Sequence, residues 1–423
     1  MLPPRRVVIT GIGVVAPRGI GVKNFWETLT SGRSATRNIT AFDATGFRSR
    51  IAAECDFRPE ENGFTEEQAQ RMSRSSQFAH VAAREALEQS GLEVTDRVAA
   101  RMGVALGSAV GSVRELDRAY RDISGDGASW ELTPGKAGPY LADYNTPSSL
   151  VREIAWLTGA QGPAAMISAG CTSGLDSVGY ACDILREGSA DVVIAGATDA
   201  PITPITVACF DAIKATSPNN ADPGHASRPF DRDRDGFVLG EGAAVFVLET
   251  AEHAHARGAH VIAEVAAFAA RCNAHHMTAL RPDGREMSAA IDSALATARV
   301  APEAIDYINA HGSGTKQNDR HETAAYKRSL GDAARTTPVS SIKSVIGHSL
   351  GAIGSIELAA CALAIEHGVI PPTANLHTPD PDCDLDYVPL EAREKRVDVA
   401  LSVGSGFGGF QSAAVLVKEG ANR

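Results

Sequence analysis

Long apolar stretches are missing from this chain of 423 residues. No run of about 18 uncharged apolar residues occurs, so the sequence predicts no membrane span. Basic residues and a short apolar stretch precede Gly11, but the longer apolar core of a signal peptide does not follow them. We therefore expect a cytoplasmic protein.

An excess of positive charge is missing as well. The formal net charge is -11 at pH 7, whereas proteins that bind nucleic acid or anionic membranes usually carry a basic balance or a basic stripe. These two classes of partner are therefore not expected. A local basic patch for an acidic protein remains compatible with this total.

Paired cysteines are the third absence. The seven cysteines are odd in number and form no C-x-x-C pair, which fits reduced thiols better than a disulfide framework or a zinc site. No bound metal is expected. Cys182, Cys209, Cys272 and Cys361 lie in core-like contexts and are expected to be buried. Cys171 has different surroundings.

The pattern of apolar residues predicts an α/β fold with layered sheets, because short β-branched runs alternate with longer Ala-rich stretches. The composition is that of an ordinary globular protein, and the length allows two or three domain-sized cores. Predicted strands cover residues 7–10, 192–195, 244–248 and 400–403, and predicted helices cover residues 77–90, 287–299 and 350–367.

A domain boundary is predicted after Glu249, where a strand ends and a charged helix begins. It divides the chain into residues 1–250 and 251–423, and each part holds a comparable series of units. No sequence repeat is clear enough to prove a duplication. Irregular stretches at residues 111–146 and 217–236 are expected to form loops that cover a site.

Cys171 lies where an apolar strand turns through small residues into a helical pattern at residues 175–186. Small neighbours let the backbone turn sharply, as in the nucleophile elbow of hydrolases. The helix dipole and the free N–H groups at such a position favour thiolate over thiol and can hold an oxyanion. A small buried cysteine at a tight turn is the structural alternative.

Two histidines, His311 and His348, each follow a predicted strand and lie beside a glycine. A single histidine in such a place is usually structural or solvated. Two of them in matching surroundings, together with a candidate thiolate, predict a shared pocket. The first half of the chain thus supplies a nucleophile and the second half supplies imidazoles.

Carbon–carbon bond formation explains this set of groups. Transfer of an acyl group onto Cys171 needs a thiolate and an oxyanion hole, and its extension needs a carbanion equivalent from a second thioester. Loss of CO2 from a malonyl group gives an enolate, whose oxygen two neutral histidines can hold with their N–H donors.

Three further residues support this chemistry. Lys343 and Glu322 are expected to form a buried ion pair that fixes His311 and the local field, with exposed positions as the alternative for each. A Gly-rich turn at residues 404–410 follows the predicted strand at residues 400–403. It can bring a backbone N–H toward the thioester oxygen while Phe407 moves as a gate.

Together these residues resemble the β-ketoacyl synthase family of the thiolase fold over nearly the whole chain, from residues 7–11 to residues 406–409. The nucleophile, the lysine and both histidines occur in the order and surroundings that this family uses. A segment at residues 228–242 also looks like one of the family. The resemblance implies a thiolase-like α/β fold in which two similar halves give five layers, α-β-α-β-α.

The resemblance also implies a role for each residue. Cys171 carries the growing acyl chain, the two histidines form the decarboxylation site, and the N–H groups of Cys171 and Phe407 form the oxyanion hole. The chain itself binds no cofactor, since the substrate arrives on the 4'-phosphopantetheine of an acyl carrier protein. The residues expected to contact that arm are Thr278, Ser313 and Thr315.

Details resemble the ketosynthase alpha subunit of bacterial type II aromatic polyketide synthases. Three segments carry this likeness: residues 314–323, where fatty-acid enzymes tend to carry Ser-Thr-Pro, residues 347–355 and residues 409–413. This subgroup pairs with a chain-length-factor subunit of the same fold in a heterodimer and uses malonyl units on an acyl carrier protein.

Carrier proteins are acidic, so a ketosynthase needs basic residues where one docks. Arg71, Arg74 and Lys214 are the candidate docking charges, and the alternative for each is an ordinary solvated side chain.

Other functions compete with this interpretation. A homodimeric fatty-acid ketosynthase would have the same chemistry. A thiolase would carry a second cysteine in the final turn, where this chain has Ser405 and Phe407, and a relative of chalcone synthase would carry Asn in place of His348. A non-catalytic subunit such as the chain-length factor itself would typically lack Cys171.

Overall fold

The computed structural model describes residues 5–129 and 133–421 and contains two groups of strands with the same order. In the first half the order is β6 (Ala164–Ile167), β5 (Met102–Gly107), β7 (Val192–Asp199), β9 (Gly242–Thr250) and β1 (Val7–Ala16). In the second half the order is β12 (Val339–Ser340), β11 (Tyr307–Asn309), β15 (Val399–Gly406), β16 (Phe410–Val417) and β10 (Ala263–Cys272).

The strand directions match in the two halves. β5 is parallel to β6 and β7, and β11 is parallel to β12 and β15. The next two strands of each half are antiparallel to their neighbours. β1 and β10 pair through Val8 with Glu264 and Ile9 with Ala263, so the two groups form one continuous path of strands.

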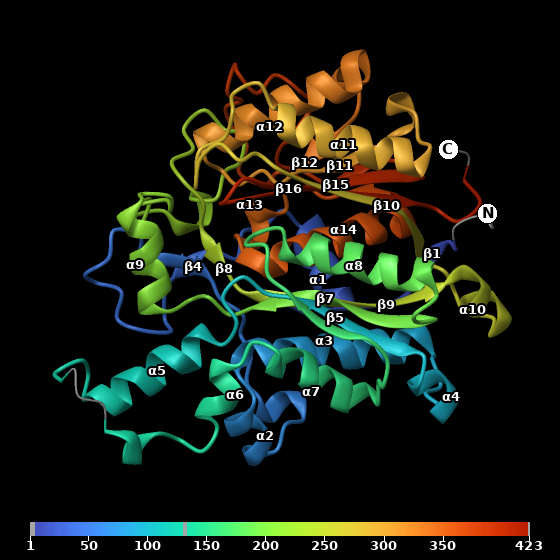
Figure 1. The fold of residues 1–423 in the computed structure, drawn as a ribbon. Helices are drawn as coiled ribbons and strands as arrows, with labels where there is room; N and C mark the ends of the chain where they lie inside the picture. Colours follow the sequence, from blue (N-terminus) through green and yellow to red (C-terminus); the bar gives the residue numbers. More distant parts are fainter. Residues whose placement is uncertain (1–4, 130–132, 422–423) are drawn as a thin grey trace.

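Helices make the layers around these strands (Figure 1). α3 (Arg74–Ser90) and α7 (Ser149–Thr158) cover the outer face of the first half, and α11 (Arg285–Ala298) and α12 (Lys316–Leu330) cover the outer face of the second half. α8 (Ser173–Glu187) and α14 (Ile353–His367) lie between the two sheets. The five-layer arrangement with two similar halves is therefore confirmed.

The place of α14 in the central layer explains why this helix is so apolar. The stretch Leu350–His367 is the one span in the described residues that is long and apolar enough to cross a membrane, and 89% of it is buried inside the protein. A helix enclosed between two sheets has no solvent-facing side, so apolar residues occupy its whole circumference. This stretch is a core helix in the structure.

Predicted elements occur where the sequence placed them. β1, β7, β9 and β15 contain the four predicted strands, and α3, α11 and α14 correspond to the predicted helices. β9 ends at Thr250 and α10 (Ala251–Ala256) begins at the next residue, where the domain boundary was predicted. The stretch at residues 111–146 differs from expectation, because it contains α5 (Val113–Ser124) and α6 (Leu141–Asn145).

Shorter elements complete the fold. They are β2 (Gly19–Ile20), α1 (Val22–Thr30), β3 (Arg37–Asn38), β4 (Ile51–Ala53), α2 (Glu66–Arg71), α4 (Asp96–Ala99), α9 (Pro204–Ala212), β8 (Leu239–Gly240), α13 (Lys343–Ile346), β13 (Val369–Ile370) and β14 (Arg393–Glu394).

Candidate active site

The carboxyl ends of the parallel strands of both halves meet around a pocket of about 620 Å³. Cys171 follows β6, His311 follows β11, His348 follows β12 and α13, and Phe407 follows β15; all four line this pocket. Sheets of parallel strands typically bind ligands at this end. The structure therefore brings together the predicted nucleophile, both predicted histidines and the predicted gate.

The Cys171 turn is held by its own small neighbours. Gly170 has φ +60°, a left-handed conformation that glycine adopts without strain. The Ser173 hydroxyl accepts a hydrogen bond from Ala169 N at 2.9 Å and donates one to Gly170 O at 2.6 Å. These bonds close the turn directly before α8, so Cys171 lies beside the N-terminus of that helix as predicted.

The pKa of Cys171 depends on burial as well as on the helix N-terminus. Burial raises the pKa of its thiol to about 11, and the charge of Asp199 raises it too. The charge of Lys343 and the N–H groups of Phe407 and Cys171 lower this pKa, but burial outweighs them. The N–H groups at the helix N-terminus therefore favour the thiolate as predicted, but their effect on the pKa is smaller than that of burial.

Two backbone N–H groups converge on the Cys171 sulfur. They belong to Cys171 itself and to Phe407 in the turn after β15, and both favour negative charge at that point. Paired N–H donors beside a nucleophile are the arrangement that stabilises the oxyanion of acyl transfer. The Phe407 ring lies 6.2 Å from the Phe210 ring, centroid to centroid, and is partly exposed; its movement as a gate stays a prediction.

The two histidine rings lie side by side in the pocket. The centroids of His311 and His348 are 5.3 Å apart, and the ring planes make an angle of 78°. Burial holds the pKa of each ring well below its usual range, and the nearby charge of Lys343 lowers both further. Both rings are therefore neutral at pH 7, in agreement with the expectation from the sequence.

The ring nitrogens of the two histidines have different surroundings. His348 Nδ1 accepts a hydrogen bond from Leu350 N at 3.1 Å, so the proton of the neutral ring is on Nε2. His311 Nδ1 is buried and has no hydrogen-bond partner in the described part of the chain. The protein thus selects the tautomer of His348, whereas the tautomer of His311 is left to a ligand.

Lys343 pairs with Glu357 of α14, not with Glu322, so the predicted Lys343–Glu322 ion pair is wrong. Lys343 Nζ also donates to the backbone oxygen of His311. Glu322 instead accepts hydrogen bonds from the N–H groups of His311 at 2.6 Å and Gly312 at 2.8 Å. Both predicted residues therefore position His311 through its backbone, from opposite sides.

This buried cluster includes one residue that sequence reasoning missed. Glu357 lies in the middle of the predicted helix at residues 350–367, where a carboxylate far from either end of so apolar a stretch was a usable signal. Burial raises the pKa of Glu357 to about 8 and that of Glu322 to about 7, while the charge of Lys343 acts to lower both.

The residues predicted to contact a phosphopantetheine arm also line the pocket. They are Thr278, Ser313 and Thr315. The hydroxyl oxygens of Ser313 and Thr315 are 3.1 Å apart, and Thr315 caps α12 by accepting a hydrogen bond from Asn318 N at 3.3 Å. The structure brings these polar groups to one wall, and their contact with an arm remains a prediction.

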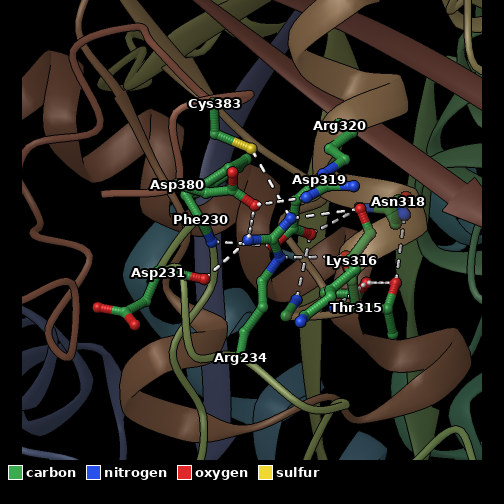
Figure 2. Close-up of polar contacts among 12 residues, drawn as sticks. Phe230, Asp231, Arg234, Thr315, Lys316, Asn318, Asp319, Arg320, Asp380 and Cys383 are labelled. Carbon is green, nitrogen blue, oxygen red and sulfur yellow. Dashed lines mark hydrogen bonds and ion pairs between the residues drawn. The ribbon is translucent and has the colours of Figure 1, made fainter. Parts of the chain in front are cut away.

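A buried arginine fixes that wall (Figure 2). The Arg234 guanidinium lies between Asp319, at 2.9 Å, and Asp380, at 2.7 Å, and its side chain is fully buried. Asp319 also accepts a hydrogen bond from Gly314 N at 3.2 Å. The ion pairs therefore hold the loop before α12 in place. The sequence showed Arg234 only as part of the family-like segment at residues 228–242.

The predicted docking charges are not equivalent. Arg71 pairs with Glu153, and Arg74 pairs with Glu241 at 2.7 Å with only 14% of its side chain exposed. Neither arginine lines the pocket. Lys214 is exposed and lies at the pocket, so it is the one of the three whose position suits an arriving acidic partner.

Two of the cysteines expected in the core are exposed. Cys182 and Cys361 are buried as predicted, but Cys209 on α9 and Cys272 at the end of β10 are exposed. The prediction is wrong for these two because the local sequence is apolar while Cys209 lies on an exposed part of α9 and Cys272 lies at the exposed end of β10.

Known proteins resemble this chain over nearly its whole length. Residues 4–254 match the model for the N-terminal domain of β-ketoacyl synthases, and residues 262–377 match the model for the C-terminal domain. The tetracenomycin polyketide synthase ketoacyl synthase alpha subunit of Streptomyces glaucescens is 64% identical over 414 residues, which cover 98% of this chain and 97% of that protein.

Two solved structures have a similar fold. One is AntDE:AntF, a type II polyketide synthase acyl-carrier protein in complex with its ketosynthase bound to the hexaketide; it has a TM-score of 0.91 and 38% identity and covers 98% of this chain and 99% of that one. The other is the ishigamide ketosynthase/chain length factor, with a TM-score of 0.90 and 37% identity over 99% of this chain and 100% of that one.

Proposed function

The chain belongs to the β-ketoacyl synthase family and is a condensing acyltransferase, and we propose that its pocket lengthens a Cys171-bound acyl chain by decarboxylative condensation with a malonyl thioester. The observation that carries this proposal is the shared pocket, where a thiol, two neutral imidazoles and two converging N–H groups face the same space. Its similarity to ketosynthase alpha subunits makes a growing polyketide the expected acyl chain.

The first step moves an acyl group onto Cys171. The sulfur attacks the carbonyl carbon of an acyl thioester, and the N–H groups of Cys171 and Phe407 hold the resulting oxyanion. The donor sulfur then leaves as a thiol, with the proton that Cys171 gave up. Because burial raises the pKa of Cys171 to about 11, the thiol has to give up its proton during the attack, and the charge of Lys343 favours that loss.

The second step breaks the bond between the carboxylate carbon and the α-carbon of a malonyl thioester. CO2 leaves, and the electron pair remains on the thioester fragment as an enolate. N–H donors of His311 and His348 hold the enolate oxygen. His348 is prepared for this role, because the hydrogen bond from Leu350 to Nδ1 leaves Nε2 as its donor.

The third step joins the two fragments. The enolate carbon attacks the acyl carbon on Cys171, the oxyanion again forms at the N–H groups of Cys171 and Phe407, and its collapse expels the Cys171 thiolate. The product is a 3-oxoacyl thioester, and the negative charge of the malonyl carboxylate ends on the sulfur. Lys343 stabilises that charge, since it lowers the pKa of the thiol.

An acyl carrier protein is the proposed donor of both thioesters. Thr278, Ser313 and Thr315 suit its 4'-phosphopantetheine arm because they line the pocket with hydroxyl groups, and Lys214 suits its acidic surface. One similar structure is described as a ketosynthase in complex with its acyl-carrier protein. None of the three proposed steps requires a cofactor bound to the chain.

A chain-length-factor subunit of the same fold is the proposed partner. β6 is the last strand in the order of the first half, and its outer edge pairs with no other strand among the described residues. An open strand edge is a place where another chain can pair. One similar structure is described as a ketosynthase/chain length factor, which supports a heterodimer.

The proposal is tested by expressing the chain with its carrier protein and a candidate chain-length factor, supplying malonyl groups and reading the product by mass. We expect condensed chains, and co-purification of the two homologous subunits. Absence of any condensed product with a correctly loaded carrier would overturn the proposed function. Full activity of a homodimer would instead show that the chain assembles as a homodimeric fatty-acid ketosynthase does, without a chain-length factor.

A further inference from the structure

Asp199, at the end of β7, is a fully buried carboxylate that joins the first half of the molecule to the loop after His348. Its Oδ2 accepts hydrogen bonds from Gly351 N at 2.7 Å and Ala109 N at 2.9 Å. Its Oδ1 accepts one from the Ser108 hydroxyl at 2.5 Å. The side chain has no exposed surface, so these bonds replace all of its contacts with water.

The turn that Asp199 holds is strained at Leu350. Leu350 has φ +50°, which places a bulky residue in the left-handed region that side chains disfavour. Such a conformation persists only where the surrounding structure supports it. The supports here are the Asp199 bond to Gly351 and the close packing of Gly351, where an added Cβ would lie 2.4 Å from Ala109 N and 2.6 Å from Asp199 Oδ2.

The strained turn has a chemical consequence for His348. In this conformation Leu350 N points at His348 Nδ1 and donates to it at 3.1 Å. The neutral ring can then carry its proton only on Nε2, the nitrogen left to face a ligand. A relaxed turn would take the N–H away from Nδ1, and either nitrogen could then carry the proton.

We propose that Asp199 is a positioning residue for His348: by holding Gly351 it keeps Leu350 in its left-handed conformation and so selects the Nε2–H tautomer of the decarboxylation site. The inference rests on the proposed function, because it concerns the donor that holds the enolate oxygen. Asp199 acts through the turn and touches no reacting atom, so it is distinct from the histidines themselves.

The charge of Asp199 also acts on Cys171, so its removal should affect the sulfur and His348 in opposite directions. The carboxylate raises the pKa of the Cys171 thiol, so a neutral replacement favours the thiolate. Asp199→Asn should therefore impair the histidine half of the chemistry while it leaves the sulfur at least as reactive as before. A change that merely loosened the pocket would impair both.

The test measures the two reactions separately in the purified assembly. Decarboxylation of malonyl-pantetheine is followed by CO2 release, and alkylation of Cys171 by iodoacetamide is followed by intact mass at pH 8. Since loss of one well-placed donor typically costs about 10²-fold, we expect Asp199→Asn to lower decarboxylation about 10- to 100-fold. Alkylation should proceed at the wild-type rate or faster.

Asp231→Asn is the matched control. Asp231 is also a buried carboxylate that accepts backbone N–H bonds, from His377 at 3.0 Å and Thr378 at 2.7 Å, but it makes no bond to the His348 turn. Its replacement should lower stability without changing the ratio of decarboxylation to alkylation. A ratio altered as much by Asp231→Asn as by Asp199→Asn would overturn the proposal.

A second variant reaches the same turn from its other side. Gly351→Ala keeps Asp199 but forces the turn away from it, so it should lower decarboxylation with the same sparing of alkylation. A nitrogen-15 spectrum of histidine-labelled protein reads the His348 tautomer without turnover, and the Nε2–H form should be lost in both variants. An unchanged tautomer and unchanged decarboxylation would sink the inference, whereas a wild-type protein that never decarboxylates the thioester would sink the proposed function instead.

Discussion

The two halves of the molecule have the same strand order and carry different chemistry at equivalent turns. In the first half, the turn after β6 brings the thiol of Cys171 to the pocket, and the turn after β7 carries the buried carboxylate of Asp199. In the second half, the turns after β11, β12 and β15 bring an imidazole, an ammonium group and a backbone N–H, on His311, Lys343 and Phe407.

The comparison shows a division of labour on one scaffold. In the proposed mechanism, the first half makes and breaks the bond to the acyl chain through Cys171. The second half handles charge, because it holds both neutral rings and the buried pair of Lys343 and Glu357. A substitution in one half should therefore impair either the reactions at the Cys171 sulfur or decarboxylation, but not both. A substitution that merely disturbed the whole pocket would impair both.

Removal of the thiol should have the largest effect and should abolish condensation without abolishing decarboxylation. We expect Cys171→Ala to lower condensation by at least about 10⁴-fold, since it removes the nucleophile that holds the chain. Decarboxylation of malonyl-pantetheine should continue, because both histidines remain. Product mass and CO2 release measure the two reactions, and condensation at a near wild-type rate would mean that another residue carries the chain.

Removal of either ring should produce the converse result. His311→Ala and His348→Ala each take one N–H donor from the enolate oxygen, so we expect decarboxylation to fall about 10²- to 10³-fold. Alkylation of Cys171 by iodoacetamide should stay close to the wild-type rate. If alkylation fell in parallel with decarboxylation, the division between the halves would be wrong.

Disruption of the buried pair should affect stability and the sulfur together. Lys343→Met leaves Glu357 buried without its partner, so the free energy of unfolding should fall by about 3 kcal/mol. The pKa of Cys171 should rise further above about 11, since Lys343 lowers it, and alkylation should become slower at each pH between 7 and 10. Denaturant unfolding and alkylation rates against pH provide the measurements.

The control for this pair is the double variant Lys343→Met with Glu357→Gln, in which no buried charge is left alone. It should regain most of the lost stability but none of the alkylation rate. Equal stability of the single and double variants would show that Glu357 does not depend on Lys343.

A surface charge should have the smallest effect. We expect Lys214→Glu to raise KM for a malonyl carrier protein about two- to fivefold, and less at high salt, because an exposed charge contributes little and is screened. Turnover of malonyl-pantetheine should not change. Lys418→Glu, an exposed lysine outside the pocket lining, is the matched control and should leave both substrates unaffected.

Local patterns were sufficient for the elements and for bringing out the residues proposed to react. Strand and helix positions follow from apolar periodicity, and Cys171, His311 and His348 lie at strand ends that glycines mark in the sequence. The pairing of Lys343 could not be found this way, because Glu322 and Glu357 are both plausible partners in sequence and only packing selects between them.

Burial is the other quantity that local patterns did not provide. Cys209 and Cys272 have apolar neighbours in sequence but are exposed, while Arg74, interpreted as a surface charge, has a side chain that is only 14% exposed. The same limit explains the pKa of Cys171: a helix N-terminus is visible in the sequence, but the depth of the sulfur is not.

The sequence by itself determined the α/β class, the family, and the residues proposed to carry out the condensation, because these depend on periodicity and on motifs that are contiguous in the chain. The tertiary structure alone decided which carboxylate pairs with Lys343, that Arg234 braces the wall near Ser313 and Thr315, and that Asp199 reaches the His348 turn. These choices depend on distances between segments far apart in the chain, and on removal from water, which the order of residues does not specify.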